Sequence, residues 1–393
     1  MRIAIFSDNF YPELSGISDS IILLAKELAR LGHKIDFYVP EYGRKDYYGA
    51  NKELILGKNI RIKRLFSLPA PFAGAKARLV LPTLLRSSYK NFKADIIHSQ
   101  LFFGVGLEAL ALAKHFKLPL VGTNHTAITE FVKAWPYIPD LFKKPSLNYA
   151  VWYYNRCDFV TAPSQSVFKE MYQFGFNKPH KVISNPIDIS DTFRPFGSKP
   201  EYKQKFKLSN NTVVYAGRLS PEKNIEVLIK AVTLAKEKIS DINLAIAGLG
   251  KFEPEIRRLV KELAIEKAVK FFGTLSQKDL AKLYQAAEIF SIASTSETQS
   301  LTLMQAMACG LPAVVVNARA LPEYVNDKNG YVVKVGDEKA MAEKFILLLR
   351  DQKLRQELSR GAYDFVQQFS APNIAKKWEE LYKKVIEDYK NKA

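Results

Sequence analysis

The sequence predicts an α/β protein built from two doubly wound domains. Short apolar runs alternate with helical patterns through residues 1–190, and the same alternation returns in residues 209–370. Between them, residues 191–208 follow no regular period and contain turn-forming residues, which is typical of a linker. Such alternation indicates a parallel sheet with helices on both faces. A chain of 393 residues also exceeds one ordinary core and suits two domains.

The first domain has the clearer strand pattern. A helix is predicted over 18–32, because its apolar side chains recur at helical spacing and Gly32 stops it. Apolar runs bounded by turn residues predict strands at 2–6, 34–40, 94–99, 118–125 and 157–164.

The second domain repeats this organisation and is followed by a long final helix. Strands are predicted at 212–220, 242–248, 270–275, 288–294 and 311–317, with a helix beginning near Pro221. Residues 371–393 form a Lys/Glu-rich amphipathic helix, which we expect to pack back on the first domain. Ligands of open α/β sheets bind beyond the carboxyl ends of the strands. We therefore expect the two domains to face each other across a ligand-binding cleft.

The composition indicates an anionic partner. The formal net charge is +18, and residues 58–93 hold nine basic side chains and no acidic one. A nucleic acid, a membrane surface, a phosphorylated ligand and a merely solvated lysine-rich surface are all compatible with this excess. The two cysteines form neither a disulfide framework nor a zinc-binding spacing, which fits a reducing compartment. No apolar run approaches the roughly 20 residues of a membrane-spanning helix.

One helix start stands out as a candidate ligand site. The stretch SETQSLTLMQAMACG (296–310) predicts a helix that begins near Ser300, with Glu297 just before it and Gln305 one to two turns inside. The first turn of a helix has free N–H groups at the positive end of the dipole, which attract anions. Here that turn holds Ser300, Leu301 and Thr302. An elongated anionic ligand such as a nucleotide sugar has the right shape to lie across this end.

Two cations of the same domain complete the predicted anion site. Arg218 and Lys223, in AGRLSPEKN, follow a predicted strand end and open a helix. Guanidinium and ammonium groups at such a position suit the binding of a diphosphate. The alternative is a solvated pair of surface charges.

The motifs together resemble the retaining GT-B glycosyltransferases of family four. The resemblance spans nearly the whole chain, and the motifs occur in the family's order. It rests on FSDNFYPELSGIS (6–18), NHT (124–126), NPID (185–188), GRLSPEKN (217–224), AGLG (247–250), FFGTL (271–275) and SETQSLTLMQAMACG (296–310).

The resemblance implies a role for each matched residue. Glu297 would contact hydroxyl groups of the donor sugar, and Arg218 with Lys223 would bind the diphosphate. Gly16 would let the backbone approach the diphosphate, and His125 would lie near the reacting sugar. The resemblance also implies a UDP-sugar donor, retention of anomeric configuration, and neither a tightly bound cofactor nor an essential metal. The alternatives are a helix cap for Glu297, a turn for Gly16 and a structural role for His125.

The sequence departs from the family pattern at two positions. Gln305 replaces the second Glu of the family's Glu-x7-Glu signature, which binds the ribose; it keeps one acceptor oxygen and loses the charge. Ser15 stands where many members have the first Gly of a pair. His98, in IIHSQ, receives no role at this stage.

The basic and aromatic segments predict a membrane surface as the place of reaction. Trp and Tyr beside Lys and Arg, as in 58–93 and 131–157, suit a membrane–water interface. The SETQSL form resembles the diacylglycerol glycosyltransferases, which make monohexosyl diacylglycerol. The predicted membrane-binding residues are Arg61, Lys63, Arg64, Phe66, Phe72, Lys76, Arg78, Arg86, Trp135 and Trp152.

The implied reaction moves glucose or galactose from a UDP-sugar to 1,2-diacylglycerol at the inner face of the cell membrane. A peripheral cytoplasmic protein is therefore expected, with the nucleotide sugar, diacylglycerol and an anionic surface as partners. One alternative is a family-four enzyme that acts in solution on a saccharide or another small acceptor. A remote alternative, a basic nucleic-acid-binding protein, lacks any recognisable motif.

Overall fold

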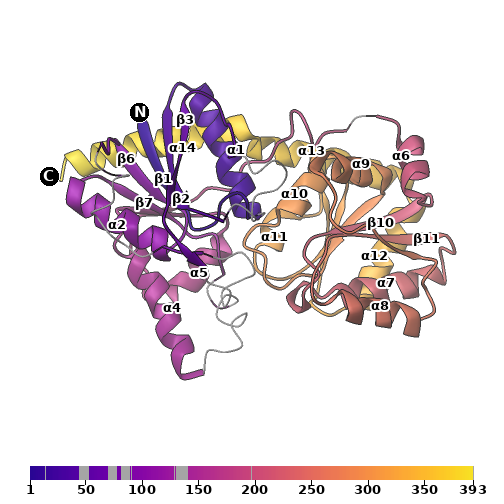
Figure 1. Ribbon diagram of the computed structural model, residues 1–393. Helices are drawn as coiled ribbons and strands as arrows, with labels where there is room; N and C mark the ends of the chain where they lie inside the picture. Colours follow the sequence, from indigo (N-terminus) through magenta and orange to yellow (C-terminus); the bar gives the residue numbers. More distant parts are fainter. Residues whose placement is uncertain are drawn as a thin grey trace. The chain divides into compact units, whose positions relative to one another are not determined.

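The computed structural model divides the chain into two compact units. Met1–Pro186 and Ala371–Ala393 form the N-terminal unit, and Ile187–Ser370 form the C-terminal unit (Figure 1). Both contain a parallel sheet with helices, so the predicted α/β class is confirmed. The residues that the structure describes are 1–13, 15–43, 53–69, 78–80, 89, 91–127, 129, 140–195 and 197–392, with backbone alone for 140–146.

The N-terminal unit is built on a seven-stranded sheet in the order β3-β2-β1-β6-β7-β8-β9, and all its neighbouring strands are parallel. A separate two-stranded antiparallel sheet pairs β4 with β5. The strands are β1 (Arg2–Phe6), β2 (Lys34–Pro40), β3 (Ile60–Leu65), β4 (Leu68–Pro69), β5 (Arg78–Leu79), β6 (Ile96–Ser99), β7 (Leu120–Thr123), β8 (Phe159–Ala162) and β9 (His180–Val182).

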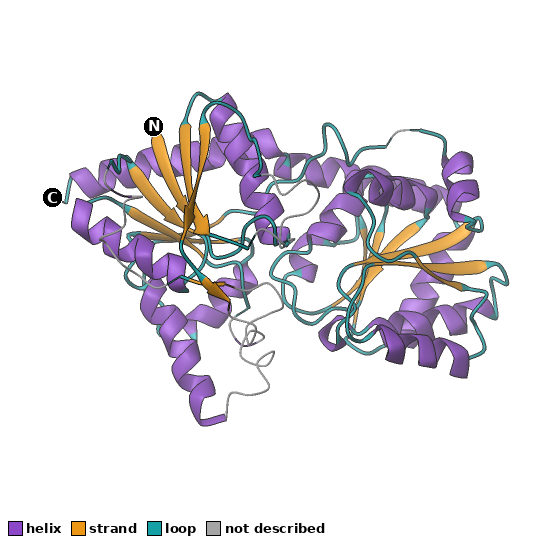
Figure 2. Cartoon of the chain, in the orientation of Figure 1, coloured by secondary structure: helices purple, strands orange, loops and turns teal. Residues whose placement is uncertain are grey.

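Helices cover this sheet, and the last of them comes from the far end of the chain (Figure 2). Helix α14 packs against α1 and buries Trp378, Leu381 and Val385, the apolar face seen in the sequence. The helices of this unit are α1 (Gly16–Arg30), α2 (Gly104–Phe116), α4 (Asp140–Tyr154), α5 (Gln165–Tyr172) and α14 (Ala371–Lys390).

The C-terminal unit has a six-stranded parallel sheet in the order β12-β11-β10-β13-β14-β15. Its strands are β10 (Asn211–Ala216), β11 (Ile242–Ala247), β12 (Val269–Phe271), β13 (Ile289–Ile292), β14 (Ala313–Val316) and β15 (Gly330–Val333). Its helices are α6 (Lys199–Phe206), α7 (Ile225–Lys236), α8 (Glu253–Glu262), α9 (Gln277–Ala286), α10 (Leu301–Ala308), α11 (Leu321–Tyr324), α12 (Glu338–Arg350) and α13 (Gln352–Val366), with short 3₁₀ turns η4 (Pro221–Lys223) and η5 (Gln367–Phe369).

Helix α6 and strand β3 are among the elements that the sequence analysis did not place. Helix α6 lies within the expected linker, residues 191–208, and packs against α9. Its Lys203 ammonium pairs with the buried Glu288 carboxylate at 3.0 Å. Strand β3 occupies the start of the basic segment, because its alternating Ile and Lys/Arg residues suit an edge strand with one face packed on the core.

The strand ends of the C-terminal unit are held together by close backbone approaches. A Cβ on Gly248 would lie 1.9 Å from the Gly217 oxygen, and a Cβ on Gly250 would lie 1.9 Å from the Leu219 oxygen. The Leu219 N–H donates to the Leu249 oxygen at 3.0 Å. Only glycine allows this approach, so the AGLG motif joins the loops that follow β10 and β11.

We expect Gly248→Ala to destabilise the C-terminal unit by about 3 kcal/mol, because it adds a backbone collision to a positive φ of 140°. The matched control is Gly336→Ala, which shares a positive φ but has no atom within 4 Å of the new Cβ. It should cost only about 1 kcal/mol. Urea denaturation measures both, and equal losses would show that the close approach carries no strain.

Candidate functional site

The strand order of the C-terminal unit places its ligand site between β10 and β13. These neighbouring strands are the point where the order reverses: after β10 the chain moves to β11 on one side, and after β13 to β14 on the other. The loops that follow them therefore diverge and leave a crevice at the carboxyl edge of the sheet. Every residue predicted to bind the donor in this unit follows one of these two strands.

Hydrogen bonds and an ion pair join the two loops directly. The Asn224 side-chain amide donates to the Ala293 oxygen at 3.1 Å, and the Thr295 N–H and hydroxyl donate to the Glu222 oxygen at 3.1 and 3.4 Å. The ion pair joins Lys223 Nζ to Glu297 Oε1 at 2.5 Å. The turn η4 is thus fixed against the segment that leads into α10.

The ion pair brings together two residues that the sequence analysis had assigned to different parts of a donor. The Lys223 and Glu297 side chains are only 16% and 11% exposed. Because little water reaches them, each charge is compensated mainly by the other. The Glu297 carbonyl accepts from the Ala320 N–H at 3.2 Å, which holds the backbone as well. A phosphate that entered here would meet a lysine that is already positioned.

Helix α10 begins at Leu301, one residue after the predicted point. Ser300 is its N-cap, and its hydroxyl accepts from the Leu303 N–H at 3.3 Å. By position, the N–H groups of Leu301 and Thr302 have no acceptor inside the helix. Gln305 is partly exposed although both its neighbours are buried, so it lies on the face away from the core.

Arg218 lies on the opposite loop and is exposed. Its carbonyl oxygen accepts from the buried Tyr215 hydroxyl at 2.9 Å, so the backbone is fixed while the guanidinium faces solvent. This combination suits a cation that binds a ligand from solution.

The N-terminal unit has an equivalent reversal between β1 and β6. Gly16 is the first residue of α1 and is exposed, as an approach by a ligand requires. Ser15 is the N-cap of α1, and its hydroxyl accepts from the Ser18 N–H at 3.1 Å. This explains one departure from the family pattern, because glycine has no side chain with which to cap the helix.

His125 lies at the end of β7 and is buried. Its Nε2 is 2.6 Å from Oε1 of Gln100, which follows the neighbouring strand β6. Burial lowers the pKa of His125 to about 4, so the imidazole is neutral at physiological pH. A neutral imidazole at this place can hydrogen-bond a hydroxyl group of a sugar.

Sequence reasoning missed Asp8, which follows β1. It is 8% exposed, and its Oδ1 accepts from the Val105 N–H, at the start of α2, at 2.9 Å. Burial, with a smaller effect of the Glu13 charge, raises its pKa to about 7. The sequence did contain a signal for Asp8. Its carboxyl group follows a buried strand, at the same carboxyl edge of the sheet where His125 lies.

The described part of the predicted membrane surface divides into exposed and internal residues. Arg61 and Phe66 are exposed, Phe66 by 66%. Trp152 is 41% exposed on α4, with the Arg156 guanidinium 3.9 Å from its ring centre. Phe72, Lys76, Arg86 and Trp135 lie outside the described residues.

Three of the predicted membrane-binding cations make contacts within the N-terminal unit. Arg64 donates to Glu53 at 2.6 Å and also to the carbonyls of Pro40 and Tyr11. The Lys63 ammonium donates to the Tyr38 hydroxyl at 2.8 Å, and Arg78 donates to the Ser67 carbonyl at 2.7 Å. The contacts of these three side chains stabilise the edge of the unit, which gives them a structural role whatever the surface binds.

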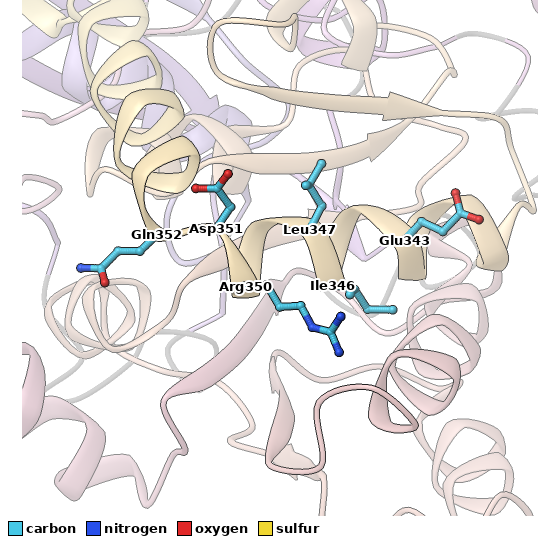
Figure 3. Close-up of a pocket in the computed structure, with 6 residues that line it drawn as sticks. All are labelled: Glu343, Ile346, Leu347, Arg350, Asp351 and Gln352. Atoms are coloured by element: carbon cyan, nitrogen blue, oxygen red, sulfur yellow. The ribbon is translucent and has the colours of Figure 1, made fainter.

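Other features of the chain lie away from this site. A shallow depression is lined by residues of α12 and the start of α13 (Figure 3), none of which belongs to the loops after β10 and β13. Among the described residues, no three His, Cys, Asp or Glu side chains are grouped to hold a metal ion. No helix in the described ranges has the length and apolar character needed to cross a membrane.

Two family models together match most of the chain. Residues 14–191 match the family described as Glycosyltransferase Family 4, and residues 198–365 match the family described as Glycosyl transferases group 1. The fold and these matches define the class: the chain is a glycosyltransferase of the GT-B fold. It belongs to the glycosyltransferases that carry a family 4 domain followed by a group 1 domain.

Among curated proteins, the chain is similar to two alpha-monoglucosyldiacylglycerol synthases. That of Streptococcus pneumoniae is 27% identical, with 97% of this chain and 85% of that protein covered. That of Acholeplasma laidlawii is 24% identical, with 98% of each covered. The chain also resembles the solved structure of HepE from Anabaena in complex with UDP-glucose, with a TM-score of 0.77, 21% identity and coverage of 98% and 100% of the two chains. This last likeness is one of fold.

The raised pKa of Asp8 has a measurable consequence for stability. The pKa is 3.8 in the unfolded chain and about 7 in the folded protein, so the folded protein alone retains the proton between these values. The contribution of Asp8 to the free energy of unfolding therefore falls as the pH rises through this window. We expect Asp8→Asn to stabilise the protein relative to wild type by about 2–3 kcal/mol more at about pH 8 than at about pH 5.

Urea denaturation at the two pH values measures this difference. Asn retains the oxygen that caps α2, so the comparison isolates the charge. Asp388→Asn, at an exposed position of α14, is the control and should show no such difference. The same gain at both pH values would mean that Asp8 ionises normally in the folded protein.

Proposed function

We propose that this glycosyltransferase moves a hexose from a UDP-sugar to 1,2-diacylglycerol at a membrane surface, with retention of anomeric configuration. The observation that carries the proposal is the near-full-length similarity to two synthases whose names specify a glucosylated diacylglycerol. Glucose and galactose both remain compatible with the donor site.

Retention is supported by the chemistry of donor and product. The names of the two relatives specify an alpha product. The glucose of UDP-glucose is itself alpha-linked, so an alpha product retains the configuration of the donor. In such a transfer the departing diphosphate and the incoming acceptor hydroxyl lie on the same face of the sugar.

The departing diphosphate is proposed to bind in the crevice between β10 and β13. Negative charge builds up on the diphosphate as the glycosidic bond breaks, and preorganised cations and N–H groups lower that barrier. Arg218, Lys223 and the first turn of α10 are proposed to fill this role. Glu297, oriented by Lys223, is proposed to accept hydrogen bonds from sugar hydroxyls, and Gln305 from the ribose.

The N-terminal unit is proposed to bind the acceptor, diacylglycerol, at a lipid surface. Phe66 is 66% exposed, and the paired Leu68 and Leu79 are 45% and 40% exposed, which is unusual for such side chains so close together. Arg61 is exposed on β3, the strand that ends just before Phe66. Exposed apolar side chains suit the boundary between lipid headgroups and acyl chains, and an exposed cation suits an anionic surface.

A second candidate is transfer to a small soluble acceptor. It is favoured by the similarity to N-acetyl-alpha-D-glucosaminyl L-malate synthase of Bacillus anthracis, which is 28% identical over 97% of each chain. A screen of UDP-glucose, UDP-galactose and UDP-N-acetylglucosamine against diacylglycerol vesicles, L-malate and inositol 3-phosphate decides between the two. Monohexosyl diacylglycerol as the main product supports our proposal, and transfer only to a soluble acceptor contradicts it.

We expect Arg218→Ala to lower kcat by about 100-fold or more, because it removes a cation from the charge that develops on the diphosphate. The fold should be unaffected, since the side chain is exposed. Arg360→Ala, an exposed arginine of α13, is the control and should keep wild-type turnover. Near-normal turnover of Arg218→Ala would remove this residue from the site.

We expect Gln305→Glu to tighten UDP binding by up to about tenfold, because a charged acceptor strengthens hydrogen bonds to the ribose diol. Gln305→Ala should weaken UDP binding and leave kcat at saturating donor little changed. Isothermal titration with UDP measures both. Unchanged affinity in both variants would mean that position 305 does not meet the ribose.

We expect the combined variant Arg61→Gln and Phe66→Ala to weaken binding to anionic vesicles by about tenfold or more, because one cation contributes about 1 kcal/mol and an apolar anchor is lost as well. Vesicle sedimentation at low and high salt measures this. Lys278→Gln, an exposed lysine of α9, is the control for charge alone. Undiminished binding would place the membrane contact elsewhere.

A further inference from the structure

A continuous series of polar contacts links the C-terminal helix to His125. The Tyr382 hydroxyl of α14 lies 2.7 Å from Nδ1 of His98, which is on β6. The side-chain nitrogen of Gln100 lies 3.2 and 3.1 Å from the two ring nitrogens of His98. The side-chain oxygen of Gln100 lies 2.6 Å from Nε2 of His125. All four residues belong to the N-terminal unit.

These side chains are packed so that they have little freedom to rearrange. Tyr382 and His98 are fully buried, Gln100 is 1% exposed and His125 is 8% exposed. The Trp378 ring, also on α14, lies 4.5 Å from the His98 ring, centre to centre. Removing a hydrogen-bond partner from a buried polar group destabilises the folded protein. This arrangement of side chains is therefore strongly preferred over others that leave a polar group unpaired.

The contacts also determine where the protons lie. The Gln100 oxygen only accepts, so Nε2 of His125 must carry the hydrogen. Burial lowers the pKa of both histidines, that of His98 to about 3, so both rings are neutral and carry one N–H each. Nδ1 of His125 is then the unprotonated nitrogen.

A matching arrangement exists at His98. Burial raises the pKa of Tyr382 well above its ordinary value, so its hydroxyl keeps its proton and can donate to Nδ1 of His98. The hydrogen of His98 is then on Nε2, which lies 2.6 Å from Oγ1 of Thr123. In this arrangement the side-chain N–H of Gln100 donates to Nδ1 of His98, because Nε2 is itself a donor.

We propose that Gln100, His98 and Tyr382 are positioning residues that hold His125 in a single tautomer and orientation for transfer. Helix α14 therefore contributes to the reaction through Tyr382, although it is 284 residues from His98 in the sequence. The inference rests on the proposed function and on the role that the family resemblance implies for His125, near the reacting sugar. The two tautomers exchange the donor and acceptor nitrogens of the imidazole. The wrong tautomer would therefore present a donor where the sugar requires an acceptor, or an acceptor where the sugar requires a donor.

The direct test is the tautomer of His125 in the full-length protein, read from ¹⁵N chemical shifts of labelled histidine. Wild type should show the Nε2–H form. Gln100→Leu should shift His125 to a mixture of tautomers, because the acceptor is lost while the volume is kept. Gln100→Glu retains an acceptor oxygen and should keep the Nε2–H form. An unchanged His125 tautomer in Gln100→Leu would overturn the inference.

Kinetics on the same variants test the consequence for transfer. Gln100→Leu should lower kcat about tenfold with little change in the donor KM, because the imidazole is misplaced and binding is not lost. Tyr382→Phe keeps the packed ring and should lower kcat about threefold. Tyr389→Phe, on the same helix, is the control and should lower neither. A changed tautomer with normal kcat in both variants would overturn the positioning role.

These readouts separate this inference from the proposed function. The ¹⁵N spectra report the tautomer whatever reaction the enzyme performs. If His125→Ala retained normal transfer while Gln100→Leu changed the tautomer, the role of His125 in the proposed function would fail, and the contacts with α14 would be purely structural.

Discussion

The ion pair between Lys223 and Glu297 is the interaction on which the candidate donor site depends. It joins the loop after β10 to the segment before α10, and two backbone-directed hydrogen bonds support it on either side. Because both side chains are largely buried, neither charge would be stable there without the other. The site is therefore shaped before any ligand arrives. Ligand binding to a preformed site costs less free energy, because fewer side chains and loops must become ordered.

On the proposed function, this preformed site would explain how the enzyme tolerates Gln305. The diphosphate is the most highly charged part of a nucleotide sugar, and we propose that it meets the cations and helix N–H groups of this site. The ribose end would then need to contribute less to affinity, and an amide with one acceptor oxygen would suffice there. In the N-terminal unit, the substitution at Ser15 has a similar local compensation, since the serine side chain caps α1.

Much of the fold followed from the sequence because its signals are local. The alternation of apolar runs and helical periods predicted the two parallel sheets, and Ser300 and Gly310 predicted the ends of α10 to within two residues. Strand β3 and helix α6 were missed because charged side chains masked their period, although tertiary packing suffices to form them. Glu297 and Lys223 were both selected from motifs. Their direct pairing was not foreseen, because it depends on the distance between two loops 74 residues apart. The contacts of His98 and Tyr382 likewise needed the fold, since no local pattern relates β6 to the last helix.

The central claim is that the nucleotide diphosphate binds at the carboxyl ends of β10 and β13. Hydrogen–deuterium exchange of the full-length protein, with and without UDP, tests it most directly, because the backbone N–H groups themselves are the proposed ligands. We expect UDP to slow exchange in residues 217–224 and 297–303 and to leave α12 unchanged. Protection confined to other parts of the chain, with no change in these two segments, would contradict the account.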